Sequence, residues 1–170
     1  MSSDEELMDA VREGNEEAYI TLFSRHRAGL YGYALRMTRR AEVADEVFQE
    51  TFLRVHRSRA TWSNHEGTFR SWLYRIATNT IRDRARSAAR RPEVLGESWE
   101  EVVHPSHTDR IALEQALAAL PENLRDAFVL TAVLGMDHNE VAVALEISPD
   151  NARARVSRAR ARLRELLEVS

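Results

Sequence analysis

Apolar residues recur every three or four positions along most of this 170-residue chain, and no segment shows the sustained alternation of a β-strand. In the first half, this helical spacing runs through residues 7–22, 30–37, 44–55 and 69–81. In the second half, it predicts helices over 111–120, 122–134, 137–145 and 149–167. The pattern therefore predicts an all-α protein.

Two polar segments interrupt the helical pattern. Residues 58–68, with the sequence SRATWSNHEGT, are rich in turn-forming side chains and are expected to form a loop. Residues 92–110 are acidic, contain two of the four prolines and follow no period, which is typical of a linker. We therefore expect two small helical domains, at 1–91 and 111–170, joined by a flexible linker.

The net charge of −3 conceals a strong charge asymmetry along the chain. All 24 basic residues are arginine, and six of them lie within residues 153–164, a segment without any acidic residue. Residues 1–17, in contrast, carry seven acidic side chains and one arginine. Clustered arginine beside acidic segments fits a nucleic-acid-binding protein, but it fits solvated helix faces with ion pairs equally well.

Composition excludes several function classes. The chain contains no cysteine, so it has no disulfide and no thiolate metal site or nucleophile. Its acidic start is no signal peptide, and no stretch approaches the roughly 20 apolar residues of a membrane helix. We expect a cytoplasmic protein without membrane insertion. No constellation indicates an enzyme, a cofactor or a metal site; His104 and His107 have a ligand-like spacing, but they lie in the predicted linker.

Residues 137–167 have the pattern of a helix-turn-helix. Asp137 and Glu140 are spaced as a capping box, and Ser148 followed by Pro149 is a typical helix start. Ile147 is expected to fill the angle between the two helices. The second helix has an apolar face and an opposite face of small side chains and arginines, which suits approach to the major groove. This combination favours DNA binding over an amphipathic helix that only maintains solubility.

Four segments together resemble a known protein family. They are LYGYALRM (30–37), ADEVFQETFLRVHR (44–57), TFRSWLYRIATNTIRDRARSAARR (68–91) and ALPENLRDAFVLTAVLGMDHNEVAVALEISPDNARARVSRARARLREL (119–166). In this order they are similar to regions 2.1 to 2.4 and region 4 of the extracytoplasmic-function (group IV) sigma factors of bacterial RNA polymerase. The resemblance implies an alternative sigma factor that binds core polymerase and directs it to promoters through −10 and −35 elements.

The resemblance also implies protein partners. Region 2.2 of the family binds the clamp helices of the polymerase β′ subunit, and the positions that match it are Asp45, Glu46, Gln49 and Glu50. The spacing of these residues places i,i+4 pairs on one acidic surface. Without the resemblance, an ordinary solvated helix face would be the simpler interpretation. The family further implies contact with the polymerase β flap and control by an anti-sigma factor.

Contacts with the −10 element are implied for two segments. The matching residues are Asn64, His65, Glu66, Arg75, Asn79, Arg82 and Asp83. The first three lie in the loop that matches region 2.3, which captures a base flipped from the non-template strand. Trp62 and Phe69 are expected to anchor this loop in the core. In the helix that matches region 2.4, Asn79 is expected to face bases, whereas Arg75 and Arg82 hold phosphates.

Contacts with the −35 element are implied for the last helix. The matching residues are Ser148, Asn151, Arg153, Ala154, Arg155, Ser157 and Arg158. Asn151 and Ala154 stand where the family commonly has threonine and serine, so the usual −35 sequence does not transfer to this chain. Two other interpretations remain open: a one-component DNA-binding regulator, and a sigma-mimicking adaptor that sequesters an anti-sigma factor. The region 2.3-like loop argues against the first, and the arginine-rich last helix argues against the second.

Overall fold

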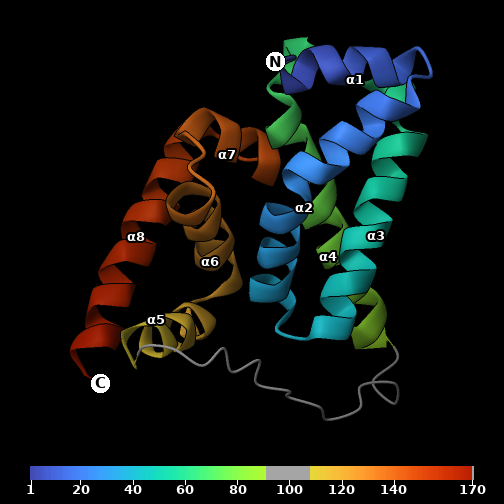
Figure 1. Ribbon diagram of the computed structural model, residues 1–170. Coiled ribbons are helices and arrows are strands. Elements are labelled where there is room, and N and C mark those ends of the chain that lie inside the picture. The colour runs from blue at the N-terminus through green and yellow to red at the C-terminus, as the bar shows by residue number, and fades with distance from the viewer. Residues whose placement is uncertain (91–107, 170) are drawn as a thin grey trace.

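The computed structural model describes residues 1–90 and 108–169, and within these ranges the chain forms helices and no strand (Figure 1). The first half comprises α1 (Asp4–Arg12), α2 (Glu16–Thr38), α3 (Ala41–Arg57), the 3₁₀ turns η1 (Arg59–Thr61) and η2 (Asn64–Glu66), and α4 (Phe69–Arg90). The second half comprises α5 (Thr108–Ala119), α6 (Glu122–Phe128), the π-helical turn η4 (Val129–Val133), α7 (His138–Leu145) and α8 (Pro149–Glu168). The all-α prediction is confirmed. Most of the predicted linker, with His104 and His107, lies outside the described residues.

The first two helices begin at side-chain caps. The Ser3 hydroxyl accepts a hydrogen bond from the Glu6 N–H, and the Glu6 carboxylate accepts one from the Ser3 N–H, which completes a capping box at α1. Gly14 has a φ of 92°, and Asn15 then caps α2 by accepting from the Ala18 N–H at 3.1 Å. The apolar stripe at 7–22 is therefore divided between two helices, because Gly14 and Asn15 interrupt it.

The segment predicted as one helix over 122–134 has the expected ends but an irregular interior. After α6 the chain passes into the wider π-helical turn η4 and leaves it at Gly135, which has a φ of 68°. Arg125 on α6 donates hydrogen bonds of 2.9, 3.0 and 3.2 Å to three main-chain carbonyl groups at the end of α5. Such carbonyls have no partner within their own helix, so Arg125 joins α6 to α5.

The helices of the first half pack around an aromatic cluster. α2, α3 and α4 lie side by side, and α1 crosses near one end of this bundle (Figure 1). Tyr19 and Phe23 on α2 contact Phe48 and Phe52 on α3, with ring centroids 4.8–6.3 Å apart in edge-on or tilted geometry. Edge-on aromatic pairs add stabilisation beyond the burial of their area, so these rings fix α2 against α3.

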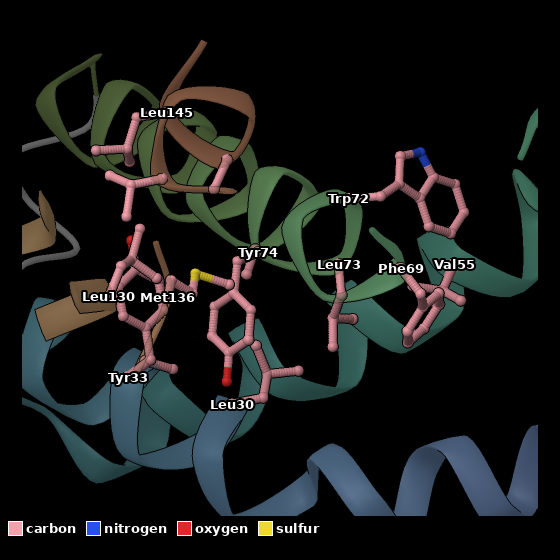
Figure 2. Close-up of a cluster of buried hydrophobic side chains, with 14 of the residues drawn as sticks. Leu30, Tyr33, Val55, Phe69, Trp72, Leu73, Tyr74, Leu130, Met136 and Leu145 are labelled. Carbon is pink, nitrogen blue, oxygen red and sulfur yellow. The ribbon is translucent and has the colours of Figure 1, made fainter. Parts of the chain in front are cut away.

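The two halves share one buried core, because α7 packs against α4. Tyr33 and Tyr74 from the first half meet Leu130, Met136 and Leu145 from the second half (Figure 2), and none of these five residues is more than 2% exposed. A smaller apolar cluster joins α5 to α8. The helix-turn-helix is therefore seated on the first half of the chain.

Polar contacts surround this shared core. Arg70, in the first turn of α4, pairs with Glu140 of α7 at 2.7 Å and donates to the carbonyl of Leu134 at 3.0 Å. The Thr68 hydroxyl also donates to Glu140, at 3.1 Å. A second interhelical pair joins Arg36 of α2 to Glu114 of α5 at 3.1 Å. Glu140 has a double role, since it also completes the capping box at the start of α7.

The shared core predicts that a cavity in it destabilises both halves together. We expect Leu145→Ala to lower the free energy of unfolding by about 2–5 kcal/mol, because the side chain is fully buried. Urea denaturation followed by circular dichroism measures this loss. Amide hydrogen exchange should show lower protection in α4 as well as in α7. Unchanged protection in α4 would mean that the two halves unfold independently.

Candidate nucleic-acid and polymerase interfaces

The helix-turn-helix begins at the caps that the sequence predicted. Asp137 accepts a hydrogen bond from the Glu140 N–H at 2.8 Å, and Glu140 accepts from the Asp137 N–H at 3.1 Å. Ser148 accepts from the Asn151 N–H at 3.1 Å, so it caps α8. Ile147 is half-buried and packs against the shared core. The turn therefore fixes α8 relative to α7, as expected.

The two faces of α8 differ as predicted. Its buried face consists of Ala152, Val156, Ala159 and Leu163. The expected DNA-facing residues that are exposed are Ser148, Asn151, Arg153, Ser157 and Arg158, whereas Ala154 and Arg155 are half-buried. The outer face is therefore polar and includes the small side chain of Ser157, which allows close approach to a DNA groove.

Most arginines on the outer side of α8 are available for a partner. Arg153 pairs with Asp150 at 2.7 Å, but both side chains are largely exposed, so the pair contributes little. In the described ranges, Arg158, Arg160 and Arg164 form no ion pair with an acidic side chain. Such unneutralised arginines are suited to phosphate contacts.

The polar loop, Ser63–Thr68, has three consecutive exposed residues at its tip. Asn64, His65 and Glu66 form the 3₁₀ turn η2, and all three are exposed. The Ser63 hydroxyl accepts from the His65 N–H at 3.3 Å, and Glu66 lies 3.9 Å from Arg75 of α4. The tip of the loop therefore has few contacts of its own, and its position depends on how the ends are held, including the hydrogen bond from Thr68 to Glu140.

Buried aromatic rings hold both ends of the polar loop. Trp62 is 2% exposed and Phe69 is fully buried, which confirms their predicted role as core anchors. Their ring centroids are 5.9 Å apart, and both contact Trp72, at 5.4 and 6.1 Å. Figure 2 shows Phe69 and Trp72 beside Leu73 and Val55. The buried aromatic side chains thus support the loop, whose exposed polar side chains could bind an unstacked nucleobase.

The polar residues predicted on α4 differ in their surroundings. Arg75 lies near Glu66 of the polar loop, and Asn79 is half-buried. Asp83 is paired with Arg54 of α3 at 3.0 Å and with Arg86, and the hydrogen bond from Arg54 is the main reason that its pKa is lowered. Asp83 therefore joins α4 to α3 in this structure.

Arg82 contacts the second half of the chain. It lies 3.5 Å from Asp126 of α6, whose side chain is almost completely buried. Burial raises the pKa of Asp126 to about 7, against the opposing effects of the Ala127 N–H and of Arg82 and Arg155. The arginine expected to hold a phosphate thus faces a carboxyl group of the helix-turn-helix half.

The predicted acidic surface of α3, formed by Asp45, Glu46, Gln49 and Glu50, is partly neutralised. Asp45, Glu46 and Gln49 are exposed, as a docking surface requires. Glu46 pairs with Arg84 of α4, and Glu50 pairs with Arg54 at 3.1 Å. These pairs are solvent-accessible and hence weak, so a basic partner can replace the arginines.

Sequence reasoning missed three contacts between distant segments. Glu140 was identified as a cap, but its ion-pair partner Arg70 lies 70 residues away, and no local spacing connects them. Asp126 lies beside an apolar run, and the helical periodicity there does not indicate that Arg82 is its partner. Glu5 accepts a hydrogen bond from the Phe69 N–H at 3.0 Å, although it stands in an acidic segment that resembles a solvated helix face.

Family comparisons agree with the two helical halves. The sequence profile of Sigma-70 region 2 matches residues 22–91, and that of Sigma-70, region 4 matches residues 110–163. The chain belongs to the sigma-70 family. Related sequences place it more narrowly, because it is 36% identical over 169 residues to the RNA polymerase sigma factor CarQ of Myxococcus xanthus, covering 94% of this chain and 95% of CarQ. This sigma factor is also 33% identical over 167 residues to the ECF RNA polymerase sigma factor SigM of Mycobacterium tuberculosis, covering 97% and 85% of the two chains.

Solved structures share the fold. The sigma factor is similar to CnrH, solved in complex with the cytosolic domain of CnrY, with a TM-score of 0.75, 31% identity and 96% of each chain covered. The fold is also that of the sigma factor RpoE from Bartonella quintana, with a TM-score of 0.73 and 24% identity over 89% and 98% of the two chains. The protein is therefore an extracytoplasmic-function sigma factor that acts in transcription initiation.

The described ranges contain neither a membrane-spanning helix nor a cluster of metal ligands. Within residues 1–90 and 108–169, no helix is both long and apolar enough to cross a bilayer. In the same ranges, no three His, Asp or Glu side chains gather as metal ligands would.

The raised pKa of Asp126 predicts a pH-dependent stability. A carboxyl group whose pKa rises on folding, here from about 4 to about 7, loses stabilisation as the pH rises through that window. Asp126→Asn keeps a carbonyl acceptor for the Ala127 N–H but cannot ionise. The rise in pKa corresponds to about 4 kcal/mol at pH 8. We therefore expect the melting temperature of the variant to exceed that of the wild type by roughly 10 °C at pH 8, and the difference to shrink steadily toward pH 5. A difference that does not vary with pH in thermal unfolding experiments would contradict this assignment.

Proposed function

We propose that this sigma factor binds core RNA polymerase through the acidic surface, recognises the −10 element with α4 and the polar loop, and recognises the −35 element with α8. The observation that carries the proposal is the polar loop, in which exposed hydrogen-bonding side chains stand on a buried aromatic base. A protein that only binds duplex DNA has no need for such a loop, whereas a protein that opens promoters must hold an unstacked base.

The acidic surface suits a basic protein partner. Its carboxylates lie on α3, away from the arginine-rich face of α8, and their present arginine partners are solvent-accessible. Charge complementarity of this kind favours rapid and specific association with a partner of opposite charge. The clamp helices of the polymerase β′ subunit are the partner that the family resemblance implies, and the β flap is the corresponding partner of the second half.

DNA contacts divide between base recognition and phosphate binding. On α8, Arg153, Ser157 and Arg158 are exposed on the outer face, while the exposed arginines farther along the helix are suited to phosphate contacts. On α4, Asn79 is the side chain suited to a base edge, and Arg75 and Arg82 are suited to phosphates. Their present partners, Glu66 and Asp126, would have to be exchanged for DNA.

The packing of α7 against α4 has a consequence for promoter binding. In the packed arrangement Arg82 faces Asp126 instead of a phosphate, and the face of α4 that packs on α7 is closed to other partners. Simultaneous use of both DNA-binding regions therefore requires the two halves to separate on the polymerase. A protein partner that stabilises the packed arrangement would act as an anti-sigma factor, and the CnrY and NepR complexes of related sigma factors support such a partner.

The central test is reconstitution with core RNA polymerase on a duplex promoter. We expect replacement of Asn64, His65 and Glu66 together by alanine to leave polymerase binding and −35 binding nearly unchanged. Promoter opening, measured by the permanganate reactivity of −10 thymines, should fall at least about tenfold, because unstacking a base costs a few kcal/mol that the loop no longer offsets.

A pre-melted template is the control for this test. It removes the need to open the duplex, so it should partly restore transcription by the triple variant. Wild-type opening of duplex promoters by the triple variant would refute the base-capture role of the polar loop.

Two arginines of α8 provide a matched comparison. If Arg153 contacts a base, Arg153→Ala should cost about 1–3 kcal/mol on the preferred −35 sequence and relax the preference at one position. Arg160→Ala should weaken binding to all sequences alike and reduce the salt dependence, because it removes one phosphate contact. Binding isotherms on permuted −35 sequences at several salt concentrations distinguish the two outcomes. Equal, sequence-independent losses would mean that Arg153 also holds only phosphate.

A further inference from the structure

Helix α1 contacts both ends of the polar loop. It lies outside the segment that matches Sigma-70 region 2, which begins at residue 22. In the structure it touches η1, which leads into the loop, and α4, which follows the loop. It also packs along α2 and crosses near the end of the first half (Figure 1). Its position therefore makes α1 the element that joins the two stems of the loop.

The position of α1 is fixed by its own contacts. Met8 is fully buried and Val11 is 3% exposed, so the apolar side of this short helix is part of the core. At its first residue, Asp4 pairs with Arg25 of α2 at 3.0 Å and with His26 at 2.7 Å. The first turn of α1 is thus held against α2 by charged contacts and by burial.

Glu5 supplies the start of α4 with a hydrogen-bond acceptor. Its carboxylate accepts from the Phe69 N–H at 3.0 Å, across 64 residues of sequence. Phe69 is the first residue of α4, and the first N–H groups of a helix have no partner within the helix. The Thr68 hydroxyl accepts from the Ser71 N–H at 3.1 Å, so the local cap leaves the Phe69 N–H to Glu5. A negative charge at this position also interacts favourably with the helix dipole.

The same turn also reaches the Phe69 side chain indirectly, through His26 of α2. The ring of His26, which Asp4 holds, lies 5.4 Å from the ring of Phe69. Phe69 in turn contacts Trp62, the residue at the other end of the polar loop. The first turn of α1 therefore holds the backbone of Phe69 through Glu5, and it holds the Phe69 ring through Asp4 and His26.

We propose that Glu5 is a positioning residue for the polar loop, holding it in the conformation that receives an unstacked base. This proposal rests on the proposed base-capture function of the loop. Because Asn64, His65 and Glu66 are exposed and have few contacts of their own, the fixed ends are what limit the number of loop conformations. Restricting a binding loop before it meets its ligand reduces the entropy lost on binding.

The test uses the full-length protein, free and in the reconstituted holoenzyme. Glu5→Ala removes the acceptor, and we expect promoter opening on duplex DNA to fall roughly 5- to 10-fold, as for the loss of one hydrogen bond of typical net strength. Glu5→Gln keeps an oxygen acceptor and should lose less than about 3-fold. Glu6→Ala is the matched control, since it removes the carboxylate of the α1 capping box in the same turn but leaves the acceptor of the Phe69 N–H in place. It should open promoters as well as the wild type does.

Two other measurements separate positioning from general destabilisation. Polymerase binding and transcription from a pre-melted template should be unchanged in Glu5→Ala. Hydrogen exchange of the Phe69 amide in the free protein should be faster in Glu5→Ala than in the wild type or Glu6→Ala.

The proposal is overturned by wild-type opening in Glu5→Ala, by an equal loss in Glu6→Ala, or by a loss that persists on the pre-melted template. Equal exchange of the Phe69 amide in all three proteins would show that the cap itself is absent. Failure of the wild type to bind core polymerase would instead refute the proposed function, whatever the Phe69 amide shows.

Discussion

Burial of α7 against α4 is the contact on which the rest of the structure depends. Tyr33 and Tyr74 come from one half and Leu130, Met136 and Leu145 from the other, and neither set could be buried to this degree without its counterpart. Removal of this apolar surface from water is the dominant favourable term, and it has no directional preference of its own. The orientation of one half relative to the other is set by the polar contacts around the core. There Arg70 binds both the Glu140 carboxylate, which caps α7, and the carbonyl of Leu134.

Arginine serves two different purposes in a chain that has no lysine. Arg125, Arg70 and Arg54 bind carbonyls or carboxylates of neighbouring helices, and their planar donor groups suit several acceptors at once. The arginines on the outer face of α8 have no such partners in the described ranges, apart from weak pairs with exposed acids. The sequence marks the α8 arginines as a run, but it does not show which of the isolated arginines have an acceptor on a neighbouring helix. Burial and the distance to an acceptor separate them at once.

The sequence predicted what depends on local spacing. Periodicity indicated the helices, and the short-range caps at Asp137 and Ser148 appeared where a capping box and a Ser-Pro start predicted them. The anchoring of the polar loop by Trp62 and Phe69 also followed from residue type alone. The division of the first apolar stripe at Gly14 was not anticipated, because Leu7, Val11, Ala18 and Leu22 keep nearly helical spacing across the break. The contacts of Arg70, Asp126 and Glu5 could not be predicted, since each joins segments whose proximity is decided by the tertiary fold.

The double role of Glu140 has a consequence for how sigma factors of this kind can recombine. One carboxylate starts a helix of the second half and pairs with Arg70 of the first half, while Gly67 and Val143 approach closely beside it. A second half transplanted from a relative would keep its own cap but could meet a different residue at position 70 and a different apolar surface around Tyr74. Exchange of promoter specificity by swapping whole halves is therefore constrained by the contacts between the halves themselves, and the two halves are expected to be inherited as a matched pair.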